Sequence, residues 1–316
     1  MNQLFVSPSP HITDLDSTRG IMLDVIIALL PAAVAAVWIF GPRSALVILV
    51  SVAAAVAAEY LSRKIMKREN TIGDLSAVVT GLLLAYNLPS TIPLWMAALG
   101  SGAAIVVVKQ LFGGIGQNFL NPALAGRIVL MCSFPAAMTN WIAPFAYRTG
   151  DAVTAASPLA AADAGSALPS ISDMLLGVRA GCLGETCVIA LVFGGLYLVL
   201  RRVISPIIPV AYIATTALLM WLGGADPLYQ ALSGGLVLGA IFMATDYTTS
   251  PLTWRGKLIF GVGCGAITAL IRLFGSLPEG VSFSIVIMNL LVPYIERLTA
   301  PKPFGREKKT KGGAAK

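Results

Sequence analysis

The chain is built from apolar runs that are separated by short polar segments. Several runs approach the ~20 residues that a helix needs to cross the hydrocarbon core of a bilayer. They are residues 21–40, 43–61, 92–111, 187–201, 204–222, 228–244, 256–274 and 280–298.

Two further runs are weaker. Residues 75–88 form a short run that ends before Pro89, and residues 122–138 form a run that contains Arg127. Short or interrupted segments often lie at the binding sites of membrane transporters. The pattern as a whole predicts an all-α polytopic membrane protein with about ten transmembrane helices.

The composition excludes an ordinary soluble domain and several classes of site. Hydrophobic residues make up 57% of the chain and charged residues only 12%, against about 25% charged residues in a typical soluble domain. The sequence contains no Walker loop, no CxxC pair and no cluster of Cys and His. We therefore expect no nucleotide hydrolysis, no metal site and no iron–sulfur cluster within this chain.

The distribution of Lys and Arg predicts the orientation. Ten spans place both termini on one side of the membrane, and the tail after Glu296 is strongly basic. Basic segments stay on the cytoplasmic side. The net charge of +7 is thus a topology signal, and nucleic acid is not an expected partner. The long polar loop, residues 139–184, then lies outside. Residues 1–20 lack the basic start of a cleavable signal peptide.

The chain also shows a faint internal repeat. The segment from Asn87 to the Leu-Phe-Gly turn at 111–113 resembles the segment from Asp246 to the same turn at 273–275. Five spans in each half give two halves of opposite orientation. The predicted organisation is an N-terminal segment 1–20, a first repeat 21–138, the outer loop 139–184, a second repeat 185–298 and a basic tail 299–316.

Ionisable residues inside apolar runs are costly unless they have a partner or a function. Asp24 and Glu59 lie near the ends of their runs, where an interfacial position accounts for them, and Asp74 is a candidate N-cap of the third run. Arg127 and Asp246 are harder to place in this way. Each is either part of a brace between the repeats or a functional group: Arg127 for an anionic or electron-rich ligand, and Asp246 for a cation or cofactor.

The segment Gly181-Cys-Leu-Gly-Glu-Thr-Cys187 places a hydroxyl, that of Thr186, where the long loop enters an apolar run. One interpretation is an ordinary helix entry with Gly184 as a turn residue. The other is an anion site beside Gly184 and Glu185, at which the Thr186 hydroxyl carries a phosphate covalently. Whether Cys182 and Cys187 form a disulfide stays open.

Four segments, taken together, resemble one family. They are Ser9-Pro-His11, Asn121-Pro-Ala-Leu-Ala-Gly-Arg127, Met243-Ala-Thr-Asp246 with Ser250-Pro251, and Gly184-Glu-Thr186. In this order they resemble the D subunits of Rnf complexes and, more distantly, the B subunits of sodium-pumping NADH:quinone oxidoreductases. One departure is Tyr247-Thr248, where the family often has Pro-Val after the aspartate.

The resemblance implies ten helices in two inverted five-helix repeats, similar to the urea-transporter architecture. It implies FMN joined by a phosphodiester to Thr186, which would be a phosphoryl threonine made by a flavin transferase, and a second flavin, riboflavin, held without a covalent bond. The expected setting is the bacterial inner membrane, with the FMN site outside and the other Rnf subunits (A, B, C, E and G) and membrane lipid as partners.

The function that the resemblance implies is electron transfer between ferredoxin and NAD, coupled to Na⁺ or H⁺ translocation. The chain has no catalytic residue of its own in this interpretation. The alternatives are the quinone-reductase B subunit, a solute channel or carrier without redox function, and a structural scaffold with Thr186 unmodified.

Overall fold

The computed structural model describes residues 17–149, 155–163, 169–275 and 280–301. The segment Ser9-Pro-His11 and most of the basic tail lie outside the described residues. Within them the regular elements are all helices. Four are long and apolar enough to cross a membrane: α1 (Thr18–Phe40), α2 (Pro42–Ile65), α14 (Trp254–Phe274) and α15 (Val281–Thr299). The prediction of an all-α membrane protein is therefore confirmed at this level.

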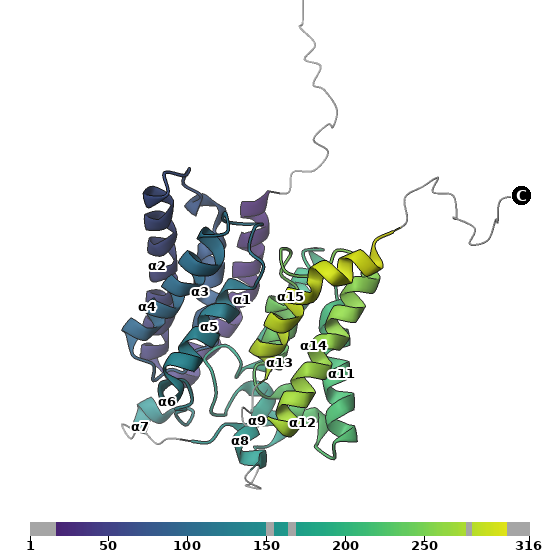
Figure 1. Cartoon of the computed structure of the whole chain (residues 1–316). Coiled ribbons are helices and arrows are strands. Elements are labelled where there is room, and N and C mark those ends of the chain that lie inside the picture. Colours follow the sequence, from purple (N-terminus) through teal and green to yellow (C-terminus); the bar gives the residue numbers. More distant parts are fainter. Residues whose placement is uncertain (1–16, 150–154, 164–168, 276–279, 302–316) are drawn as a thin grey trace, which may run out of the picture.

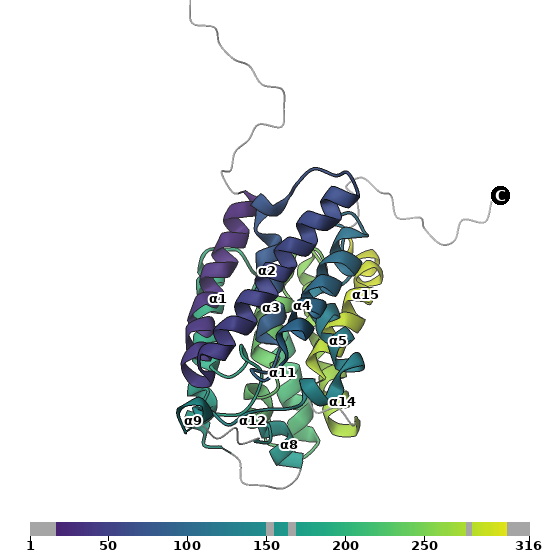
Figure 2. The ribbon, with the colours of Figure 1, turned by 90° about the vertical axis from the view of Figure 1, so that its left-hand side faces the viewer.

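Shorter apolar helices complete the bundle. They are α3 (Ser76–Tyr86), α4 (Leu94–Ala103) continued by the π-helical η2 (Ala104–Gln110), α5 (Pro122–Ser133), α10 (Val188–Leu200) and α11 (Ile207–Leu222). Helices α1 to α5 form one group and α11, α14 and α15 lie in a second group beside it (Figures 1 and 2). Helix α10 packs against α1, and α15 packs against α5, so the two groups share one apolar core.

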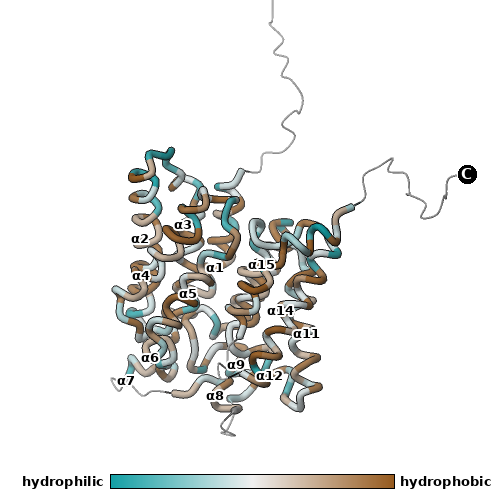
Figure 3. The backbone as a smooth tube through the Cα atoms, viewed as in Figure 1, coloured by the Kyte–Doolittle hydropathy of each residue, from teal (hydrophilic) through white to brown (hydrophobic). Residues whose placement is uncertain are grey.

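The outer surface of the bundle is apolar. Large side chains such as Val34, Leu49, Phe193, Trp221 and Phe274 are exposed. Brown colour follows the helices in Figure 3, whereas teal gathers at connections such as the one between α2 and α3. Soluble proteins rarely expose an apolar surface of this extent, and lipid explains it.

The two ends of the bundle differ. Helix α1 begins and α15 ends at the same end, here called the terminal end (Figure 1). The short helices α7 (Ala146–Thr149), α8 (Pro158–Asp163), α9 (Ile171–Leu176) and α12 (Pro227–Leu232) gather at the opposite end, here called the loop end. Placing both chain ends on one side fits the even number of spans that the sequence predicts.

The predicted continuous span 228–244 is wrong. Helix α12 ends at Leu232, and the chain resumes as α13 (Leu236–Leu238) and the π-helical η3 (Gly239–Met243). Gly234 and Gly235 interrupt the helix with φ of 66° and 67°, a conformation that glycine adopts without steric cost. Arg272 on α14 donates to the carbonyl oxygens of Gln230 (2.6 Å) and Ser233 (3.0 Å), so the break leaves these two acceptors satisfied.

The predicted span 122–138 is also interrupted. Helix α5 ends at Ser133, Phe134 leaves the helical conformation, and α6 (Pro135–Met138) follows. A proline disfavours helical geometry at the residue before it and cannot donate a backbone hydrogen bond, which accounts for the interruption.

Candidate functional site

Residues 181–187 do not lie over the bundle as a surface loop but pack into it. The Leu183 N–H donates to the Leu88 carbonyl (3.0 Å) and the Gly184 N–H donates to the Tyr86 carbonyl (2.9 Å). Both acceptors lie at the break that follows α3. A Cβ atom on Gly184 would come within 2.2 Å of the Tyr86 side chain, so glycine is required for this approach. We call residues 181–187 the docked segment.

The side chain of Glu185 is enclosed by backbone. Its Oε1 accepts a hydrogen bond from the Cys182 N–H (3.2 Å). A Cβ atom on Gly181 would lie 2.5 Å from Oε1, and one on Gly235 would lie 3.1 Å from Oε2. Gly235, at the break between α12 and α13, therefore makes room for this carboxylate, so the docked segment packs against that break.

Thr186 lies two residues before α10, which begins at Val188. Its side chain is fully buried (0% exposed), and its Oγ1 has no hydrogen-bond partner among the described residues. Leaving a buried hydroxyl without a partner costs about 1–3 kcal/mol. The docked segment thus contains a buried hydroxyl that forms no hydrogen bond with the described part of the chain.

Buried positive charge surrounds the docked segment. Arg179 Nη2 donates to the Glu185 carbonyl (2.7 Å), and Arg127 Nη2 contacts the Cys182 sulfur (3.7 Å). Arg272 braces the neighbouring break and interacts electrostatically with the Glu185 carboxylate. Burial lowers the pKa of Arg179, and the carboxylate of Glu185 opposes that shift. Among the described residues, three guanidinium groups and one carboxylate are thus buried around the docked segment.

Arg127 reaches both groups of helices. Its Nη1 donates to Asn87 Oδ1 and to Ser282 Oγ on α15, each at 2.9 Å, and only 2% of the residue is exposed. These contacts match the brace between repeats that was one of the two interpretations of this residue. They hold the Arg127 guanidinium beside Cys182 of the docked segment. Arg127 would therefore act on a ligand there through its position and its charge.

Cys182 and Cys187 are free thiols. The Cys182 thiol donates to the Asn87 carbonyl (3.3 Å). Burial raises the pKa of Cys182 to about 12. This thiol is therefore neutral at pH 7, and its contact with Asn87 anchors the docked segment.

A cavity of about 400 Å³ opens toward the terminal end, between the two groups of helices. We call it the inner cavity. Its walls are largely apolar. Its polar and charged lining residues are Thr18, Ser76, Thr80, Lys109, Asn118, Asn121, Thr245, Asp246, Tyr247 and Thr248.

Asp246, predicted from the sequence, lies in the turn after η3 and lines this cavity. Its Oδ2 accepts from the Thr249 hydroxyl (3.1 Å), and burial raises the pKa of the Asp246 carboxyl. The structure does not bring Asp246 together with Thr186. Asn121 connects the two regions because its Nδ2 donates to the Met243 carbonyl (3.2 Å) while its helix, α5, carries Arg127.

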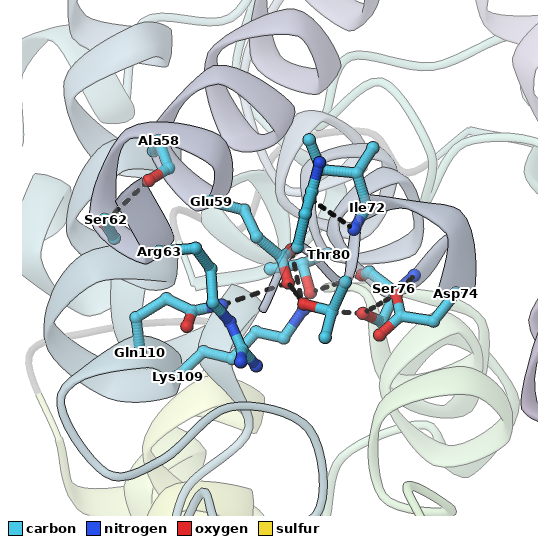
Figure 4. Close-up of polar contacts among 12 residues, drawn as sticks. Ala58, Glu59, Ser62, Arg63, Ile72, Asp74, Ser76, Thr80, Lys109 and Gln110 are labelled. Carbon is cyan, nitrogen blue, oxygen red and sulfur yellow. Dashed lines mark hydrogen bonds and ion pairs between the residues drawn. The ribbon is translucent and has the colours of Figure 1, made fainter. Parts of the chain in front are cut away.

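One buried ion pair was not predicted from the sequence. Lys109 Nζ lies 2.8 Å from Glu59 Oε2, with 3% and 0% of these side chains exposed. Figure 4 shows the carboxylate of Glu59 between Lys109 and Gln110, and Gln110 Nε2 donates to its Oε1 (3.0 Å). Glu59 is therefore buried inside the protein and paired with a cation. Lys109 was visible as a charge within the run 92–111, but nothing in the local pattern shows that its partner lies on α2.

Asp74 and Asp24 have structural partners. Asp74 Oδ1 accepts from the backbone N–H of Ser76 (2.8 Å), the first residue of α3, but the N-cap position itself is occupied by Leu75 and not by Asp74 as predicted. Asp24 on α1 accepts from Tyr197 (2.7 Å) and forms an ion pair with Arg201 (3.2 Å). The Asp24 contacts hold α1 and the end of α10 together at the terminal end.

Comparison with known proteins gives matches along almost the whole chain. The model of the NQR2, RnfD, RnfE family matches residues 5–305. The chain is 47% identical over 312 residues to the D subunit of the Na(+)-translocating ferredoxin:NAD(+) oxidoreductase complex of Acetobacterium woodii, a match that covers 96% of this chain and 97% of that protein. It is 44% identical over 321 residues to the D subunit of the proton-translocating ferredoxin:NAD(+) oxidoreductase complex of Clostridium ljungdahlii, with 96% and 97% covered. It is 38% identical over 338 residues to the D subunit of the ion-translocating oxidoreductase complex of Alcanivorax borkumensis, with 98% and 99% covered.

Proposed function

Because the chain belongs to the NQR2, RnfD, RnfE family, we propose that it is the D subunit of an ion-translocating ferredoxin:NAD oxidoreductase complex of the Rnf type. The support is identity of 47% and 44% to two such subunits over nearly the full length of each protein. The name of one relative specifies Na⁺ and that of the other specifies protons. The proposal therefore covers translocation of either ion. The chain acts with the other Rnf subunits, A, B, C, E and G, and is not catalytic alone.

In this proposal the chain spans the inner membrane with ten helices in two inverted repeats, as in the urea-transporter architecture. The short helices α3 and η3 support it, since each ends at a polar break, near Asn87 and Asp246 respectively. Hydroxyl contacts also correspond: Ser51 with Ser101 joins α2 to α4 (2.8 Å), and Tyr212 with Thr268 joins α11 to α14 (2.7 Å). The terminal end is cytoplasmic, and the loop end with Thr186 faces outward.

The proposal places FMN on Thr186 through a phosphodiester to Oγ1, made by a flavin transferase. The observation that carries it is the buried Oγ1, which has no partner among the described residues and belongs to a segment that Arg127 and Arg179 contact at Cys182 and Glu185. A phosphodiester anion at this oxygen would have guanidinium groups nearby as charged hydrogen-bond donors. Because Thr186 is fully buried, attachment requires the docked segment to leave the carbonyls of Tyr86 and Leu88, or precedes its packing.

The second flavin, riboflavin, is assigned to the inner cavity. Its volume of about 400 Å³ lies within the range of small-molecule sites, about 300–1,000 Å³. Apolar walls suit the faces of a fused aromatic ring, and Asn118 and Asn121 suit its polar edge. The flavins supply the electron-transfer chemistry when bound, while this chain holds them at fixed positions and excludes water around them.

Covalent attachment is tested by in-gel flavin fluorescence of the denatured chain, coexpressed with the flavin transferase, and by mass spectrometry of the tryptic peptide that contains Thr186. The wild type is expected to fluoresce and Thr186→Ala to be dark. Thr216→Ala is the matched control, because Thr216 is equally buried but its hydroxyl is bonded to the Tyr212 carbonyl (3.0 Å). A fluorescent Thr186→Ala variant or a dark wild type overturns the assignment.

Broken helices and an open cavity also favour a rival function, a solute channel or carrier without redox chemistry. Flux of a small solute into liposomes that contain only this chain, together with an unmodified Thr186 peptide, would support the rival. An unmodified peptide without flux would leave the scaffold interpretation. The flavin transferase experiment gives the same result for an Rnf subunit and for a quinone-reductase B subunit. These two are distinguished by purifying the complex that contains this chain and testing it for ferredoxin-dependent NAD reduction.

A further inference from the structure

The Lys109–Glu59 pair is oriented relative to the inner cavity. Lys109 and Ser76 both line the cavity, whereas Glu59 does not. Lys109 Nζ donates to Ser76 Oγ (2.6 Å) and to Glu59 Oε2 (2.8 Å). The ammonium group therefore lies on the cavity side of the pair and the carboxylate lies behind it.

The carboxylate is fixed in this rear position. Thr71 Oγ1 donates to Glu59 Oε1 (2.8 Å), and Gln110 Nε2 donates to the same oxygen (3.0 Å). Lys109 and Gln110 are consecutive residues at the end of η2, a π-helical segment. Insertions of this kind are frequent at functional sites, and here one lets two neighbouring side chains reach a single carboxylate (Figure 4).

A buried ion pair is a poor way to stabilise a fold. Desolvation of the two charges offsets most of their attraction, and apolar replacements of the same volume are often as stable. The buried Lys109–Glu59 pair therefore calls for a functional explanation in addition to any effect on stability. Among the described residues, Ser76 and Glu59 accept from two of the three donors of the Lys109 ammonium, so the third can serve a cavity ligand.

Among the described residues, the other charged side chain that lines the cavity is Asp246, in the turn that follows η3. Its pKa is raised, chiefly by burial, and its Oδ2 accepts a hydrogen bond from the Thr249 hydroxyl (3.1 Å). The cavity lining thus includes a fixed, hydrogen-bonded cation and a carboxyl group that accepts from a neighbouring hydroxyl. A ligand there meets an electrostatic environment that is positive on the Lys109 side.

We propose that the Lys109–Glu59 pair makes the inner cavity bind the negatively charged form of an electron-accepting aromatic ligand more tightly than its neutral form. The inference rests on the proposed function, in which that ligand is the second flavin. Lys109 is then a positioning and potential-setting residue: it favours the reduced, anionic flavin and so raises the reduction potential. Glu59 holds the Lys109 ammonium at the cavity wall.

The test uses the full chain in detergent with Thr186→Ala as background, so that the flavin in the cavity is the one flavin that this chain can hold in the proposed scheme. The readouts are riboflavin bound per chain, measured after acid extraction, and the midpoint potential of that flavin from an optical potentiometric titration. Lys109→Met is expected to leave oxidised riboflavin binding within about twofold. It should weaken the relative affinity for the reduced form about threefold to tenfold. A tenfold change corresponds to a midpoint potential lower by about 59 mV for a one-electron couple and about 30 mV for a two-electron couple.

Two variants control for structure. Lys109→Arg keeps the positive charge and is expected to keep the potential near the wild-type value. Ser51→Ala removes a buried hydrogen bond to the Gly81 carbonyl (3.0 Å) from the same helix as Glu59, but Ser51 is uncharged and does not line the cavity. It should leave the potential unchanged.

If Lys109→Met does not fold, Glu59→Gln with Lys109→Met removes both charges at similar volume and is expected to lower the potential in the same direction. Bound riboflavin with an unchanged potential in the charge-deleted variant overturns this inference alone. Absence of bound riboflavin in the Thr186→Ala background overturns the assignment of the cavity in the proposed function, and this inference with it.

Discussion

The docked segment at the loop end is closely packed around its polar groups, whereas the inner cavity at the terminal end leaves open space beside its polar groups. Around Thr186 the packing is closed, with Gly184 against Tyr86 beside a fully buried hydroxyl. The inner cavity offers about 400 Å³ of space and fixed charges at its walls. A covalent bond retains a ligand without a preformed pocket, whereas a ligand held without a bond needs one. This contrast is the one that the proposal requires, with one flavin attached covalently and the other held without a bond.

The two regions are nevertheless joined. Asn121 at the cavity donates to the Met243 carbonyl, and Asn87 donates to the Met243 sulfur (3.6 Å). Asn87 accepts from Arg127, which contacts the docked segment at Cys182. This chain of polar contacts runs through the middle of the bundle, so a change at one end is able to alter the geometry of the other.

The largest expected effect on stability is at the terminal end. Lys109→Met leaves the Glu59 carboxylate buried without its cation, which should lower the free energy of unfolding by about 3–5 kcal/mol. Adding Glu59→Gln should recover most of this loss, because neither charge then remains. Chemical denaturation in detergent measures both variants, and a double variant as unstable as the single one would contradict the account.

A bulky substitution in the cavity should affect ligand binding there and leave the docked segment unchanged. Ala123 is buried and lines the cavity, and Ala123→Trp is expected to weaken riboflavin binding at least about 100-fold, which is about 2.7 kcal/mol. Covalent flavin at Thr186 should remain. Extracted and covalent flavin are quantified per chain. The control is Val210→Trp on the exposed face of α11, which should change neither. Loss of both flavins in a folded Ala123→Trp chain would show that the two regions do not hold their flavins independently.

The smallest expected effect is at the loop end. Gly184→Ala forces a methyl group against the Tyr86 side chain and should lower the free energy of unfolding by about 1–3 kcal/mol. The covalent flavin content should fall although Thr186 is intact, because the docked segment is displaced. Gly102→Ala in α4 meets no atom within 4 Å among the described residues and serves as the matched control. Unchanged unfolding and unchanged in-gel fluorescence in Gly184→Ala would show that the close packing does not position the segment.

Much of the framework followed from local sequence. Runs of apolar residues predicted the helices because hydrophobic length is a property of consecutive residues. The prediction failed at Ser233–Gly235 and at Phe134, where apolar composition continues but glycine or proline ends the helix. Both failures had a visible signal, the Gly234-Gly235 pair and Pro135, that average hydropathy does not weigh.

The candidate site was predictable only in part. The sequence placed Thr186, Gly184 and Glu185 at a loop-to-helix junction and Asp246 at a polar break. It did not predict that Arg179 and Arg272 are buried near the docked segment. Each guanidinium is held by carbonyl oxygens of residues that become neighbours only after folding.

The sequence by itself determined the class of the protein, the positions of most helices, its family and the residue that is a candidate for covalent modification. These depend on composition, on consecutive residues and on short segments in a fixed order. Only the tertiary structure decided that Thr186 is buried without a partner in the described part of the chain, that Arg127 joins the two groups of helices, and that Lys109 lines the inner cavity with Glu59 behind it. The physical reason is that a buried charge or hydroxyl needs a partner, but the partner is selected by packing between helices that are far apart in the chain.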